Sequence, residues 1–145
     1  MSDKDRIHIK AIIIGIVFDV VGTFIFALIF AIIAAFPLVS RGIAPEKIEE
    51  HLAGSPVFLI LNLFNGLFFT SLGGYITALI ASERELRHAL AMGIASAIIG
   101  VVFIIIIPVS TLSWYDLLSL LFIIPCALLG GHMRIRHLKR TRRVY

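Results

Sequence analysis

The sequence predicts an all-α membrane protein with four transmembrane helices, arranged as two helical hairpins. Hydrophobic residues make up 59% of the 145 residues and charged residues only 15%, whereas a soluble domain carries about 25% charged residues. The apolar residues are grouped in long, nearly uncharged blocks of the ~20 residues that a spanning helix needs. Little of the chain is left for a soluble domain, so residues 1–145 are predicted to form one membrane domain.

The first predicted hairpin consists of spans at residues 11–36 and 57–81. The first span contains one charged residue, Asp19, and the second contains none. Pro37 is expected to stop the first span, because proline lacks the N–H that a helix interior requires.

The loop at 37–56 between these spans is predicted to contain a short amphipathic helix from Pro45 to Leu52. Pro45 suits a first helical position, and Gly54 suits a stop. We expect this short helix to lie on the outer membrane surface.

The second predicted hairpin consists of spans at residues 89–107 and 117–131. Pro108 is expected to stop the third span. Trp114 and Tyr115 are placed to anchor the start of the fourth span at the membrane interface. Residues 132–145 are then a basic tail outside the membrane.

The distribution of Lys and Arg predicts the orientation of the chain. The N-terminal segment, the second connection and the C-terminal tail carry three, two and six basic residues, eleven together, against only Arg41 and Lys47 on the other side. Short loops rich in Lys and Arg stay in the cytoplasm. We therefore expect a multi-pass protein of a bacterial inner membrane with both termini in the cytoplasm.

Small residues predict how the helices pack, because membrane helices associate where Gly, Ala and Ser let their backbones approach closely. The glycines at 15 and 22 match those at 93 and 100, and the pair at 73–74 matches the pair at 130–131. The match indicates a parallel duplication of one hairpin, with coincidence as the open alternative. The predicted packing residues are Gly15, Gly22, Gly66, Gly73, Gly74, Gly93, Gly100, Gly130 and Gly131.

Asp19 is the most informative polar residue. It lies nine residues beyond Lys10, which places it ~13 Å below the interface and near the middle of a ~30 Å hydrocarbon core. A carboxyl group there costs ~2.5–3.5 kcal/mol and usually faces a bundle interior or a cavity. No Lys or Arg lies inside a predicted span to pair with it.

Residues of similar depth on the other helices predict a polar layer around this acid. Pro125 also frees the carbonyl group of Leu121, which we expect to accept a hydrogen bond from protonated Asp19. The layer is open to three interpretations: a proton or cation site, a structural clasp, or a docking point for another subunit's helix. Its predicted members are Asp19, Thr70, Ser71 and Ser96.

The C-terminal basic run is the strongest electrostatic feature. Basic residues beside a membrane attract anionic lipid at ~1 kcal/mol each, and this interpretation is favoured over nucleic-acid binding for a tail that leaves a membrane helix directly. The expected lipid contacts are Arg134, Arg136, Lys139, Arg140, Arg142 and Arg143.

His88 is expected to be a solvated residue at a helix start. No metal site and no cofactor are predicted, since no cluster of His, Cys, Asp and Glu has ligand spacing. No Ser/His/Asp set or phosphate loop is found either, so the chain is predicted not to be an enzyme.

A stretch around the second connection resembles a signature of small, uncharacterised four-helix bacterial inner-membrane proteins. It consists of the Gly-Gly-aromatic step at Gly73-Gly74-Tyr75 and, after a short charged turn, the His-Ala step at His88-Ala89. In that group the first step ends the second helix and the second step opens the third. The resemblance implies a fold and a compartment and no reaction.

Two functions are consistent with these features. The leading one is a non-catalytic accessory or scaffold subunit that packs against partner membrane proteins or against itself as a homo-oligomer. The alternative is a small oligomeric proton- or ion-coupled transporter or channel that uses Asp19.

Overall fold

The computed structural model describes residues 8–106 and 114–141, and within them it contains five helices and no strand. The side chains of residues 140 and 141 are not described. The helices are α1 (Ile9–Ser40), α2 (Pro45–Ala53), α3 (Pro56–Ala81), α4 (Glu85–Ile106) and α5 (Trp114–Thr141). The predicted all-α fold is confirmed.

Four of the helices, α1, α3, α4 and α5, are long and apolar enough to cross a membrane. Many of their large apolar side chains point outward, as Phe36 and Ile105 do at 74% and 73% exposure. Such surfaces are stable against hydrocarbon and not against water. The chain is therefore a multi-pass membrane protein.

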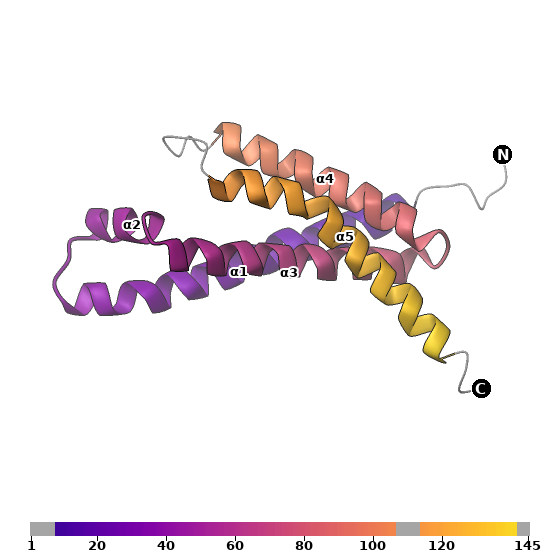
Figure 1. Ribbon diagram of the computed structural model, residues 1–145, viewed down its shortest axis with the longest axis horizontal. Coiled ribbons are helices and arrows are strands. Elements are labelled where there is room, and N and C mark those ends of the chain that lie inside the picture. Colours follow the sequence, from indigo (N-terminus) through magenta and orange to yellow (C-terminus); the bar gives the residue numbers. More distant parts are fainter. Residues whose placement is uncertain (1–7, 107–113, 142–145) are drawn as a thin grey trace.

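The spanning helices run alternately up and down, so that α1 begins and α5 ends at the end of the bundle where α3 turns into α4 (Figure 1). We call this the basic end, because Arg84, Arg87 and the basic stretch of α5 lie there. The opposite end is the distal end, where α1 and α2 extend beyond the ends of α4 and α5 (Figure 1). Both described ends of the chain thus lie on one side of the bundle.

Glycine-lined contacts hold the helices together, as predicted. A methyl group on Gly74 would overlap the carbonyl oxygen of Ala127, and one on Gly130 would overlap the carbonyl oxygen of Ser71. The two contacts lie about one turn apart on the α3–α5 seam. Backbone rather than side chains therefore forms this interface, which is the arrangement that small residues permit in membranes.

The other predicted packing glycines divide into two groups. Those at 15, 22, 73, 93 and 131 leave no room for a methyl group; for example, a Cβ on Gly131 would lie 2.7 Å from that of Ala89. Gly66 and Gly100 have nothing closer than 4.0 and 3.5 Å, respectively. These two line a cavity instead of closing a seam.

The amphipathic helix of the first loop is confirmed as α2, with Pro45 in its first turn and Gly54 directly after its last residue. Ile48 is its buried residue. The helix packs beside the distal ends of α1 and α3.

One predicted helix end is wrong, and the fourth helix extends beyond its predicted span. Pro37 lies inside α1, which continues to Ser40; a proline costs the helix one hydrogen bond and a bend, and membrane helices tolerate it. Gly130 and Gly131 lie inside α5, which runs on through the basic stretch to Thr141. Pro108 lies outside the described residues.

Candidate functional site

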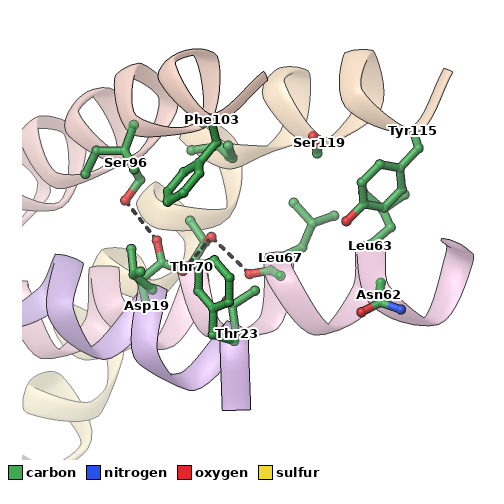
Figure 2. A pocket seen from close by; sticks show the side chains of 16 residues that line it. Asp19, Thr23, Asn62, Leu63, Leu67, Thr70, Ser96, Phe103, Tyr115 and Ser119 are labelled. Carbon is green, nitrogen blue, oxygen red and sulfur yellow. Dashed lines mark hydrogen bonds between the residues drawn. The ribbon is translucent and has the colours of Figure 1, made fainter. Parts of the chain in front are cut away.

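A cavity of about 190 Å³ lies between all four spanning helices (Figure 2). Its lining residues reach along α3 from Asn62 to Thr70 and along α5 from Tyr115 to Ile123, which makes it roughly 12 Å long. Its polar lining includes a carboxyl group, hydroxyl groups and an amide, set among apolar walls. It extends from mid-bundle toward the distal end, and none of its lining residues lies nearer the basic end than the level of Asp19.

Asp19 closes the inner end of this cavity. Its side chain is 5% exposed and each carboxyl oxygen has a hydroxyl partner: Thr70 Oγ1 donates to Oδ1 at 3.0 Å, and Ser96 Oγ donates to Oδ2 at 2.8 Å. Figure 2 shows both bonds bridging α1 to α3 and α4. The predicted polar layer is therefore present for these three residues.

Thr70 has a choice of acceptors. Its Oγ1 lies 3.0 Å from Asp19 Oδ1 and also 3.0 Å from the carbonyl oxygen of Gly66. A hydroxyl group has one hydrogen and can also accept. Thr70 can thus donate to an ionised Asp19, or donate to Gly66 while it accepts a hydrogen bond from a protonated Asp19. The site accommodates both forms of the acid by rotation of O–H bonds alone.

The structure does not bring the fourth predicted member, Ser71, to the site. Ser71 does not line the cavity, and its carbonyl group faces Gly130 of α5. Successive helical residues point ~100° apart, so only one of the neighbours Thr70 and Ser71 can face Asp19. Among the described residues, and contrary to the prediction, Asp19 bonds to Thr70 and Ser96 and not to the carbonyl group of Leu121, and the Leu121 side chain is exposed.

Sequence reasoning missed several cavity residues. Thr23, Tyr115 and Ser119 line it, although Tyr115 was expected to anchor the helix at the interface. Their spacing is a signal in the sequence: Thr23 lies four residues after Asp19, and Ser119 lies four residues after Tyr115. Residues four apart occupy one helix face, so each pair marks the face that looks into the bundle.

The asparagines of α3 have separate roles. Asn65 Nδ2 donates to the carbonyl oxygen of Thr23 on α1 at 3.1 Å, so it links two helices. Asn62 Nδ2 donates within its own helix, to Phe58 at 3.0 Å, and its side chain lines the cavity near the distal end.

The basic side of Asp19 is closed by small residues and by the buried side chain of Met92. Gly15 meets Thr77 and Gly73, and the Cβ of Asp19 itself lies against Gly73. Thr77 is fully buried, and its Oγ1 has no hydrogen-bond partner among the described residues. No cavity-lining residue is found at this level, so the described contacts separate Asp19 from the basic end.

His88 is not solvated, contrary to expectation: it is 4% exposed at the start of α4. Its Nε2 accepts a hydrogen bond from the backbone N–H of His8 at 3.0 Å, and its Nδ1 lies 3.2 Å from the carbonyl oxygen of Arg84. An accepting Nε2 leaves the proton on Nδ1, which then donates to Arg84. His88 thus fixes the beginning of α1 to α4.

The basic residues beyond the bundle are only partly described. Arg136 and Lys139 are exposed, whereas Arg134 is half-buried. The backbone of Arg140 is part of α5, and Arg142 and Arg143 lie outside the described residues. The described part of the basic stretch projects away from the bundle (Figure 1).

Comparisons with known proteins find no match among protein-family models and no significant match among curated proteins or solved structures. The resemblance at Gly73-Gly74-Tyr75 and His88-Ala89 therefore stays a prediction. In this chain the Gly-Gly-aromatic step lies inside α3 and not at its end, because α3 continues to Ala81.

Proposed function

We propose that this chain is a small membrane protein that takes up a proton or a small cation at Asp19 from the distal side of the bundle, as part of a transport or channel cycle. The observation that carries the proposal is the cavity that ends on the carboxyl group at mid-membrane. An ionisable side chain inside a membrane marks an ion or proton pathway when it faces a cavity between helices.

The hydrogen bonds of Asp19 favour reversible binding over a purely structural clasp. A clasp needs only one set of donors and acceptors, whereas Thr70 offers two acceptors 3.0 Å away to a single hydrogen. Both protonation states of Asp19 therefore keep every carboxyl oxygen paired, which lowers the cost of changing between them. A small cation would be held by the oxygens of Asp19, Thr70 and Ser96 as hard ligands, with the two hydroxyl hydrogens turned away from it.

The cavity reaches Asp19 from one side only, which suits one state of an alternating-access cycle. The glycine contacts at Gly15 and Gly73 close the other side. The buried side chain of Met92 on α4 also packs against Gly73. Alternating access proceeds largely by rocking one repeat or bundle of helices against another. Opening the basic side would require α1 to separate from α3 at these glycines.

The proposal takes the orientation of the chain in the membrane from the distribution of its basic residues. With eleven Lys and Arg on one side and two on the other, the basic end faces the cytoplasm of a bacterial inner membrane. The distal cavity then takes its proton or cation from outside the cell. The exposed basic residues of α5 lie beside anionic headgroups in this orientation.

Flux measurements in liposomes test the proposal. Purified protein is reconstituted with an internal pH-sensitive dye, and proton uptake is followed after a pH step with valinomycin and K⁺ to balance charge; Na⁺ and K⁺ gradients are imposed in parallel. We expect flux above that of protein-free liposomes and at least a tenfold loss in Asp19→Asn, which keeps the shape of the side chain and the donor and acceptor of the protonated acid but cannot ionise.

The matched control is Ser71→Ala, which removes a neighbouring hydroxyl outside the cavity and should leave flux within twofold. Wild-type flux equal to that of protein-free liposomes under all three gradients would overturn the proposal. Equal flux in wild type and Asp19→Asn would show that Asp19 is not the group that takes up the proton or cation.

An accessory or scaffold role, in which the chain packs against partner membrane proteins or against itself as a homo-oligomer, is the second candidate. Its supporting observation is that both carboxyl oxygens of Asp19 are already paired within the chain, as a structural clasp requires. It predicts no flux, together with co-purification of a partner membrane protein or a homo-oligomer in mild detergent. A monodisperse monomer of this chain alone would count against it.

A further inference from the structure

A second feature of the bundle lies on its lipid-facing surface at the basic end. An open groove of about 540 Å³ runs between α4 and α5. Its walls are apolar and are formed by Leu86, Leu90, Pro125, Leu128 and Leu129. The groove shares no lining residue with the cavity at Asp19.

The bend of α5 opens this groove. Pro125 lies inside α5 and cannot donate to the carbonyl group of Leu121, so the helix changes direction in its middle (Figure 1). Gly131 meanwhile keeps α5 against Ala89 of α4. A bend beside a fixed contact leaves a hollow along one side of the two helices.

Cationic and donor groups occupy the mouth of the groove. Arg87 and His132 line it, and Arg136 Nε donates to His132 Nε2 at 3.0 Å, which leaves the other donors of both side chains available. A Cβ added to Gly131, the neighbour of His132, would lie 3.8 Å from the carbonyl oxygen of Glu85 and from the side chain of Leu86. The α4 side and the α5 side of the mouth are therefore at the same level. None of the lining residues is acidic.

Depth divides the groove into two parts. Arg87 and His132 lie just outside the predicted spans at 89–107 and 117–131, so we place them at headgroup level. From His132 to Pro125 the groove extends roughly 10 Å toward the bilayer centre. Polar donors therefore lie at the membrane surface and an apolar groove extends below them. A phospholipid has the same arrangement, with its phosphate group at the surface and its acyl chains below.

We propose that this groove binds one anionic phospholipid, with the phosphate held by Arg87, His132 and Arg136 and one acyl chain along the leucines. Basic pockets between helices at the membrane surface bind anionic headgroups, and Arg suits phosphate because its planar N–H groups bond two oxygens at once. The guanidinium of Arg87 forms no ion pair within the part of the chain that the structure describes. The site is independent of transport at Asp19 and is more specific than the general attraction of the basic tail.

Native mass spectrometry tests the site. The full chain is released from detergent with increasing phosphatidylglycerol or phosphatidylcholine, and the fraction with one bound lipid is measured. We expect the first phosphatidylglycerol to bind more tightly than the first phosphatidylcholine. Arg87→Gln should weaken it by about fivefold, the effect of one basic residue at a membrane surface.

Lys139→Gln is the matched control, because it also removes one positive charge from the basic end but lies outside the groove. It should change the binding constant by less than twofold. Leu129→Trp, at a position that is exposed, should fill the groove and weaken lipid binding with no change in charge. The thermal unfolding temperature of each variant is measured as well, and a value equal to that of wild type shows that the fold is kept.

The proposal fails if phosphatidylglycerol and phosphatidylcholine bind equally. It fails as well if Arg87→Gln and Lys139→Gln weaken binding by the same factor, since the tail's overall charge would then suffice. Loss of lipid preference with intact flux, or the reverse, separates this site from the one at Asp19.

Discussion

Replacing Gly130 by alanine should destabilise the bundle more than any other single methyl group on the α3–α5 seam. A Cβ at this position would overlap the Ser71 carbonyl oxygen and lie 2.8 Å from the backbone nitrogen of Tyr75. Ordinary contact begins near 3.4 Å, so α5 has to move at least 0.6 Å away from α3 even for the milder overlap. Both obstacles are backbone atoms of α3, and no side-chain rotation can relieve them.

The expected cost is about 1–3 kcal/mol, the range for adding a methyl group to a tightly packed core. That cost corresponds to roughly a 5- to 150-fold change in the unfolding equilibrium. Alanine is the better helix former, by about 1 kcal/mol in water, so any destabilisation comes from the contact and not from the helix itself.

Reversible unfolding in bicelles or mixed detergent, followed by helix content, measures this cost. Gly100→Ala is the matched control, since its Cβ would find its nearest neighbour, Leu120, at 3.5 Å. It should be neutral or mildly stabilising. If Gly130→Ala is as stable as Gly100→Ala, α3 and α5 do not pack as closely as described here.

Two further contacts give smaller, equally direct predictions. Asn65→Leu removes the donor to the Thr23 carbonyl group on α1 and should cost about 0.6–1.7 kcal/mol in the same unfolding assay. Asn62→Leu removes a bond that lies within α3, so it should cost less. Equal costs for the two variants would contradict the interhelical bond. His88→Leu removes the acceptor of the His8 N–H and should speed hydrogen exchange in the first turn of α1 about fivefold, while His88→Gln, which keeps an acceptor, should restore part of the protection. Unchanged exchange in His88→Leu would mean that His88 does not hold the start of α1.

The number and order of the membrane helices could be predicted from the sequence alone. A bilayer demands ~20 apolar residues for each span, and this requirement is local, so each block of the chain reveals it without reference to the others. The predicted helix end at Pro37 is wrong, since α1 continues to Ser40, and α5 continues as a helix beyond Gly130–Gly131. There proline and glycine, which end helices in water, are tolerated because the surrounding membrane and the neighbouring helix favour continued hydrogen bonding.

The face of each span that looks into the bundle was not predicted from the sequence. The spans are apolar nearly all round, so no stripe distinguishes the bundle side from the lipid side. Depth alone grouped Ser71 with Asp19, Thr70 and Ser96, whereas direction around the helix separates Ser71 from them. For the same reason it was not predicted from the sequence that Thr23 and Tyr115 line the cavity or that His88 is buried.

The sequence by itself determined a multi-pass α-helical membrane protein with one carboxyl group near mid-membrane. Only the tertiary structure decided that this group ends a cavity and has a hydroxyl partner on each oxygen. The physical reason is that apolar length and charge balance are properties of segments, whereas a cavity and its hydrogen bonds depend on how four helices rotate about their own axes to meet. Close contacts at a few glycines fix those rotations.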